Sequence, residues 1–120
     1  MHSSRQYHKA ASLLLILLAV GCAHWSSADS YRQAIVVGLQ TADYFQTRHI
    51  AKNPQDHFEM NPILGDHPNP SQVDTFFAAS IAGNALVSAL LPPEWRKGWQ
   101  YISIGFGGTT VMWNYQAGIR

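Results

Sequence analysis

The sequence predicts an all-α protein, in which a small three-helix domain places a helical hairpin in a membrane. Proline-containing breaks divide the chain beyond residue 29 into three long segments. The segment over 73–91 contains one charged residue, Asp74, and as a helix it spans roughly 28 Å, close to the hydrocarbon thickness of a bilayer. The domain organisation that we expect is a signal peptide over 1–21, a tether over 22–29 and the helical domain over 30–120.

The first residues have the order of a bacterial export signal. A basic start and an apolar run over 10–20 precede the small residue Gly21 and then Cys22. The apolar run is too short to cross a bilayer, because a spanning helix takes about 20 residues. Removal of this segment is therefore expected.

Cys22 is the only cysteine of the chain, so it has no partner for an internal disulfide. The residues Leu-Ala-Val-Gly-Cys over 18–22 resemble the lipobox of bacterial lipoproteins. That resemblance implies that Cys22 becomes the mature N-terminus and carries acyl chains such as palmitate. An ordinary signal, or an uncleaved anchor, with an incidental cysteine is the alternative. The expected location is the bacterial cell envelope, with a membrane-anchored N-terminus that faces the periplasm.

Loss of the signal changes the charge balance. The whole chain has 8 Lys and Arg against 7 Asp and Glu, and Arg5 and Lys9 lie in the signal, so the mature part has 6 basic and 7 acidic residues. No basic tract remains, which gives no electrostatic support for binding nucleic acid. The expected partner is membrane lipid, and no cofactor is predicted.

Three helices and one long connection make up the expected domain. The helices cover about 30–53, 70–91 and 94–117, and the connection covers 54–69. Asp29 or Ser30 is expected to cap the first helix and Asn69 the second, because short polar side chains accept hydrogen bonds from free backbone N–H groups. Pro92 and Pro93 end the second helix, since proline cannot continue the hydrogen-bonding pattern.

Charge favours insertion of the second and third helices. A soluble bundle of this size buries only about 60–65% of its unfolded surface and shows a more charged exterior. Trp95 and Trp99 flank Arg96 and Lys97, a composition typical of a membrane–water interface. Three crossings would leave this basic pair outside the cytoplasm, against the positive-inside rule. We therefore expect a hairpin of the second and third helices, with the first helix on the outer surface. A soluble bundle that uses the same aromatic residues as its core and rests on the membrane is the alternative.

Small residues on the second helix indicate contact with other helices. Ala79 and Gly83, four positions apart, let another helix approach closely, so other membrane helices or a second copy are expected partners. Asn84 shares a face with Ser80 and Ser88, and in lipid such side chains join helices by hydrogen bonds.

A group of polar residues links the first helix to the connection. Asp43 and Thr47 lie one turn apart, and Glu59 and Asn61 follow in the connection. Paired carboxylates can transfer protons or hold a cation, which makes Asp43 and Glu59 candidate catalytic residues. The structural interpretation is that Glu59, Asn61 and the turn-forming Pro62 satisfy free backbone groups, with Thr47 in a packing role.

Three histidines, His49, His57 and His67, form a second candidate site together with Glu59 or Asp66. Imidazole and carboxylate groups are metal ligands, but this spacing matches no zinc pattern, and the chain has no HExxH motif or cysteine partner. Metal binding is therefore the weaker of the two chemical hypotheses.

The order Asp43-x-x-x-Thr47, Glu59-x-Asn61-Pro62 and then two apolar helices resembles small bacterial membrane proteins of a domain-of-unknown-function type. The resemblance covers about residues 40–115 and implies membrane insertion without a stated activity. The expected function is that of a lipid-anchored envelope protein of structural or interaction type. The alternative is a small membrane-associated enzyme or metal-binding protein that uses Asp43, Glu59 and the histidines.

Overall fold

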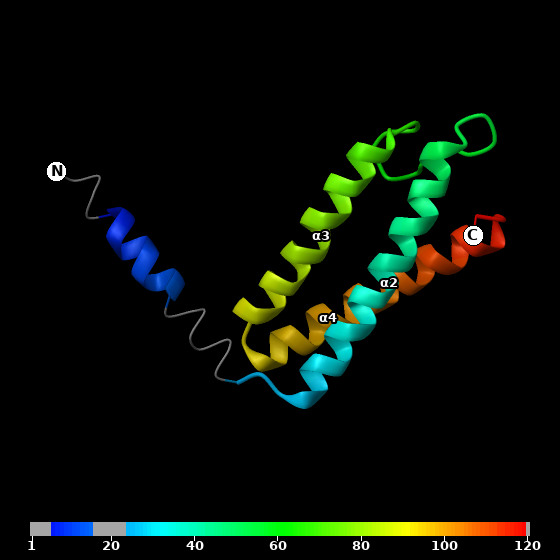
Figure 1. Cartoon of the computed structure of the whole chain (residues 1–120). Helices are drawn as coiled ribbons and strands as arrows, with labels where there is room; N and C mark the ends of the chain where they lie inside the picture. Colours follow the sequence, from blue (N-terminus) through cyan, green and yellow to red (C-terminus); the bar gives the residue numbers. More distant parts are fainter. Residues whose placement is uncertain (1–5, 16–23, 120) are drawn as a thin grey trace.

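The computed structural model describes residues 6–15 and 24–119 (Figure 1). Within these ranges the chain is helical over 6–15 and in α2 (Ser27–Lys52), α3 (Pro70–Leu90) and α4 (Pro93–Gln116), with no strand. The all-α class is thus confirmed. The predicted number of three helices is one too few for the described chain, because part of the signal-like run is helical as well. Cys22 lies outside the described residues.

Two of the helix starts have reciprocal caps. α2 begins earlier than predicted: its cap is Ser26, whose Oγ accepts from the Asp29 amide at 3.2 Å while the Asp29 carboxylate accepts from the Ser26 amide at 2.9 Å. Asn69 caps α3 as predicted, and its Oδ1 accepts from the Gln72 amide at 2.8 Å. α2 therefore includes part of the segment over 22–29 that was predicted to be a tether.

α2 lies against both other helices, whereas α3 and α4 contact each other less extensively and diverge from the turn at Pro92 (Figure 1). Gly107 brings α4 close to α2, since an added Cβ there would lie 3.2 Å from the Leu39 Cβ. We call the end of the domain that carries Ser26 and Pro92 the tether end. The opposite end, which carries the connection over 53–69, is the loop end.

The interior of the domain is unusually polar. Six polar or charged residues are buried in the described chain, against five hydrophobic ones and Pro68. Arg96, Gln100 and Ser88 are each 0% exposed. Soluble proteins show the reverse preference, since arginine and glutamine are mostly exposed in them.

The exterior of α2, α3 and α4 is apolar. Large exposed side chains cover it: Tyr31, Ile35, Phe45, Leu86, Val87, Trp95, Tyr101, Ile102, Phe106, Met112, Trp113 and Tyr115. Within 24–119, the exposed charged residues lie only at the two ends, with Glu94 and Lys97 at the tether end and Lys52, Asp56 and Asp66 at the loop end, and the half-exposed Arg48–Asp74 pair lies near the loop end. We call the uncharged surface between them the apolar band.

α3 is the one helix of the described chain that is long and apolar enough to cross a membrane, judged by length and composition. Core helices of soluble proteins have the same character, but only Val73, Phe77 and Ser88 of α3 are buried here. α4, its expected partner in a hairpin, does not meet this criterion.

Candidate functional site

Arg96 forms the centre of a buried polar cluster at the tether end. Its guanidinium donates to the Asp29 carboxylate at 2.9 Å and to two carbonyls at the end of α3, those of Ser88 at 2.6 Å and Leu91 at 3.1 Å. The last carbonyls of a helix have no partner within the helix, so this side chain supplies hydrogen bonds that water supplies elsewhere. Arg96 thereby holds α2, α3 and α4 together.

The same guanidinium holds the chain that precedes α2. It donates to the His24 carbonyl at 3.3 Å and lies over the Trp25 ring at 4.7 Å from the centroid. Asp29 shares its charge with a second arginine, because Arg32 forms an ion pair with its other carboxylate oxygen. One carboxylate thus faces two guanidinium groups.

Amide side chains extend this cluster across all three helices. Gln100 accepts from Arg32 Nε at 2.8 Å and donates to Gln33 Oε1 at 3.1 Å. Gln33 in turn donates to Asn84 at 3.1 Å, and Asn84 donates to Ser103 at 2.9 Å. Asn84, expected to join helices, therefore lies between α2 and α4.

Towards the loop end, polar side chains of α2 continue along its inner face. Gln40 donates to the Ser80 carbonyl of α3 at 3.3 Å, and Gln46 donates to the Val111 carbonyl of α4 at 3.1 Å. Asn114 of α4 donates to Gln46 at 3.1 Å. The contacts between helices are thus polar along most of the length of the domain.

The structure brings Asp43, Thr47 and Glu59 together. The hydroxyl of Thr47, which is 1% exposed, donates to the Asp43 carboxylate at 3.2 Å. Glu59 of the connection lies near enough for the two carboxylates to repel each other. Asp43 of α2 and Glu59 of the connection thus lie near each other, at the position where sequence reasoning placed a candidate site.

Asn61 and Pro62 lie in a turn of the connection. The Asn61 amide donates to the Glu59 carboxylate at 2.9 Å, and the Asn61 side chain accepts from the Ile63 amide at 2.9 Å. Gly65 closes the turn with a φ of 79°, a conformation that glycine adopts without strain. These contacts agree with the structural interpretation of Asn61, while Pro62 is exposed.

The three histidines do not converge. The rings of His49 and His57 lie 5.4 Å apart between centroids, whereas His67 is exposed. Among the described residues, no group of three or more histidine, cysteine, aspartate or glutamate side chains has the geometry to hold a metal ion. The His49 and His57 rings instead form a contact between α2 and the connection.

Sequence reasoning missed the ion pair between α2 and α3. Arg48 of α2 donates to the Asp74 carboxylate of α3 at 2.9 Å, and the Tyr44 hydroxyl donates to the same carboxylate at 2.6 Å. The signal was available, because Asp74 is the single charge of the segment 73–91. The inward position of Arg96 and Gln100 was also missed, and no pattern in the sequence marks it.

Ala79 and Gly83 do not form a close contact between α3 and the other helices of the domain. Ala79 is exposed, and a Cβ added at Gly83 would meet nothing within 4 Å. This surface of α3 is therefore uncovered by α2 and α4.

In comparisons with known proteins, no protein-family model, no curated protein and no solved structure matches this chain.

Proposed function

We propose that this chain is a lipid-anchored membrane protein of the bacterial cell envelope, in which α2, α3 and α4 are embedded together and act as a structural or interaction component. The observation that carries the proposal is the distribution of polarity. Polar side chains fill the interior, apolar ones cover the exterior, and exposed charges of the domain lie at its two ends.

Water is a poor environment for this arrangement. A large apolar side chain gains about 1.5–3 kcal/mol when it leaves water completely. Many such side chains are exposed on α2, α3 and α4. Their combined transfer free energy exceeds the about 5–15 kcal/mol that stabilises a typical domain.

A bilayer accounts for both the apolar exterior and the polar interior of the domain. Hydrocarbon covers the apolar band at no cost, while the interior amides and ion pairs bond to one another where no water is available, with the buried Gln40 Oε1 as an exception. α3 has 21 residues, or about 31 Å of helix, which matches the hydrocarbon thickness. The aromatic and charged residues of the tether end, including Trp95 and Lys97, suit an interface.

The contacts of α2 favour three crossings over the hairpin expected from the sequence. α2 buries Asp29, Gln46 and Thr47 against its neighbours, so an α2 on the outer surface would separate these contacts. Arg96, counted as a loop charge in the sequence argument, is ion-paired with Asp29 inside the domain. Arg96 therefore contributes little to the orientation that the positive-inside rule predicts, because that rule counts loop charges.

The test is fractionation of residues 23–120, exported behind an ordinary signal that adds no lipid. We expect the protein to stay with membranes through alkaline carbonate, because insertion does not depend on the acyl chains. Recovery in the soluble periplasmic fraction would overturn the proposal and leave a water-facing bundle with a lipid as its sole anchor.

A second candidate function rests on Asp43 and Glu59. Ionisable groups within a membrane-embedded domain mark ion or proton sites more often than surface groups do. Two neighbouring carboxyls beside the apolar band favour a small membrane enzyme or cation-binding protein as this alternative. The Asp43→Ala/Glu59→Ala variant separates the two: loss of function at an unchanged membrane level favours chemistry, and loss of the protein favours structure.

A further inference from the structure

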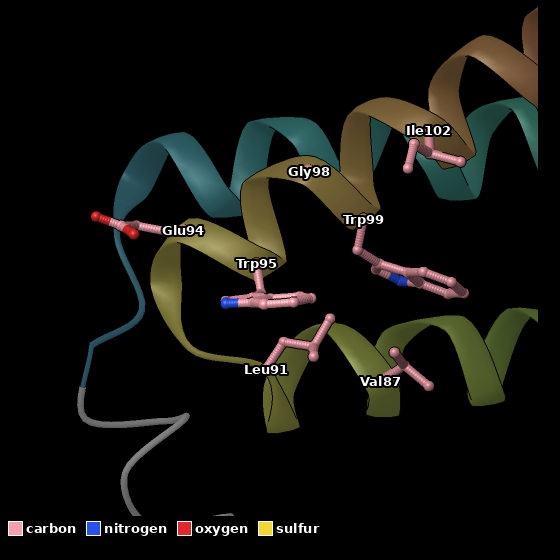
Figure 2. A pocket seen from close by; sticks show the side chains of 7 residues that line it. All are labelled: Val87, Leu91, Glu94, Trp95, Gly98, Trp99 and Ile102. Carbon is pink, nitrogen blue, oxygen red and sulfur yellow. The ribbon is translucent and has the colours of Figure 1, made fainter.

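An apolar groove of about 490 Å³ runs along the outside of the domain at the tether end (Figure 2). Leu91 and Val87 form its α3 side, and Trp95, Trp99 and Ile102 form its α4 side. Figure 2 shows both indole rings projecting from α4 towards α3, while the carboxylate of Glu94 points away from them. The volume lies within the range of small-molecule sites, and the lining is almost entirely apolar.

One buried side chain connects this groove to the chain that follows Cys22. The guanidinium of Arg96 donates to the carbonyl of Leu91, a residue that lines the groove, and to the carbonyl of His24. One guanidinium group therefore holds both the backbone at His24 and a residue that lines the groove. Cys22 precedes His24 by two residues, which allow at most about 7 Å of extended chain.

The direction of the groove matches a chain that enters from the membrane surface. It begins beside Leu91 and Glu94 at the charged tether end and reaches Ile102, two turns further into the apolar band. An acyl chain attached near the interface follows the same course towards the centre of the bilayer. Gly98 leaves the floor of the groove open, because a Cβ added there would meet nothing within 4 Å.

We infer that this groove receives an acyl chain carried by Cys22, so that the lipid docks on its own protein. The inference rests on the proposed lipidation. It assigns Trp95 and Trp99 to lipid contact and Arg96 to positioning of the attachment point. A membrane phospholipid and a second copy of the chain are the competing occupants.

The experiment uses the full chain, produced in cells that are fed a fatty acid with a terminal diazirine. The mass of the N-terminal peptide first establishes whether Cys22 carries acyl chains. Illumination then links each acyl chain to its neighbour, and mass spectrometry locates the linked residues. We expect links within one chain to Leu91, Trp95 or Trp99.

Two controls separate the possible occupants. In residues 23–120 exported without a lipid, the links in the groove should disappear, whereas a membrane phospholipid would preserve them and overturn the inference. Gly98→Leu should abolish the links by filling the groove, while Gly105→Leu, two turns along the same helix face and equally open, should retain them. Links between two chains, or equal links in both leucine variants, would also overturn it.

The outcomes distinguish this inference from the proposed function. An unmodified Cys22 defeats this inference and the lipid anchor of the proposed function, while insertion of α2, α3 and α4 is tested separately by the fractionation. If Cys22 is acylated but the links are spread over α2 or over the loop end, the lipid anchor is supported and only the inference that the acyl chain docks in the groove is refuted.

Discussion

Arg96 shows how a single side chain determines the interior of this protein. It is 0% exposed, and its guanidinium contacts a carboxylate, the last carbonyls of α3 and the backbone of the tether. Arginine suits this role because its planar group donates in several directions at once. Lysine, with one compact ammonium group, could not reach all these acceptors.

Arg96→Ala should therefore destabilise the domain strongly. It leaves the Asp29 carboxylate and the α3 carbonyls without this donor, and breaking a buried ion pair costs about 3–5 kcal/mol. The measurement is the thermal unfolding midpoint in detergent. The neighbouring Lys97→Ala removes an exposed charge and should change the free energy of unfolding by less than about 0.5 kcal/mol. Equal effects of the two variants would contradict the central role of Arg96.

Asp43 permits a prediction of the opposite sign. Its carboxylate has the Thr47 hydroxyl as a donor and Glu59 as a like charge nearby, so Asp43→Asn removes repulsion and retains a hydrogen-bond acceptor. We expect a gain of about 1 kcal/mol in the free energy of unfolding, of the size found for other optimised sites. Urea or thermal unfolding in detergent measures it, with Thr47→Val as a variant that should destabilise. A loss of stability in Asp43→Asn would assign the carboxylate to the fold and weaken the second candidate function.

At the scale of the element, each helix has two different faces. The inner face of α2 carries Gln33, Gln40 and Gln46, which bond to both neighbouring helices, and its outer face carries Tyr31 and Phe45. The uncovered surface of α3 includes small residues such as Ala79. A surface of this kind lets a further helix approach closely, whereas bulky side chains face lipid.

Gly83→Leu tests whether that surface of α3 binds another helix. The new side chain has open space within the monomer, so folding should be preserved while helix–helix association falls. Chemical crosslinking in native membranes, with the linked species identified by mass, measures the change. Gly105→Leu on α4 has equal space and should leave crosslinking unchanged. Unchanged crosslinking in both variants would show that this surface faces lipid.

For the whole molecule, the exposed charges locate the two ends of the domain. Lys97 lies at the tether end and Asp56 at the loop end, on opposite sides of the apolar band. Three crossings place Lys97 on the same side as the anchored N-terminus and Asp56 on the other. The hairpin with α2 on the outer surface reverses both positions, so the topology is open to a direct experiment.

Cysteines introduced one at a time at Lys97 and Asp56 should therefore react differently with a membrane-impermeant maleimide added from the periplasmic side. We expect labelling at Lys97→Cys and protection at Asp56→Cys until the membrane is permeabilised. The reverse pattern would restore the hairpin topology, and labelling of both residues in intact cells would contradict insertion of α2.

Local chemistry made several features of the fold predictable from the sequence. Asn69 followed three residues later by Gln72 predicts the start of α3, and the reciprocal hydrogen bonds are present. The prolines at 92 and 93 separate α3 from α4, and the connection lies where prolines and Gly65 predict it. Spacing also related Asp43 to Thr47, because residues one turn apart on a helix are neighbours whatever the surroundings.

By itself, then, the sequence determined the helices, their breaks, the cap of α3 and the pairing of residues one turn apart, because hydrogen bonds and backbone sterics within a few residues decide these features. Only the tertiary structure decided that Arg96, Gln100 and Gln33 face inward, that Asp74 pairs with Arg48, and that the histidines do not converge. Periodicity identifies residues that share a face of a helix but leaves open which face meets its neighbours. That choice depends on contacts between residues as far apart as Asp29 and Arg96, and on side chains that satisfy one another only once three helices are assembled.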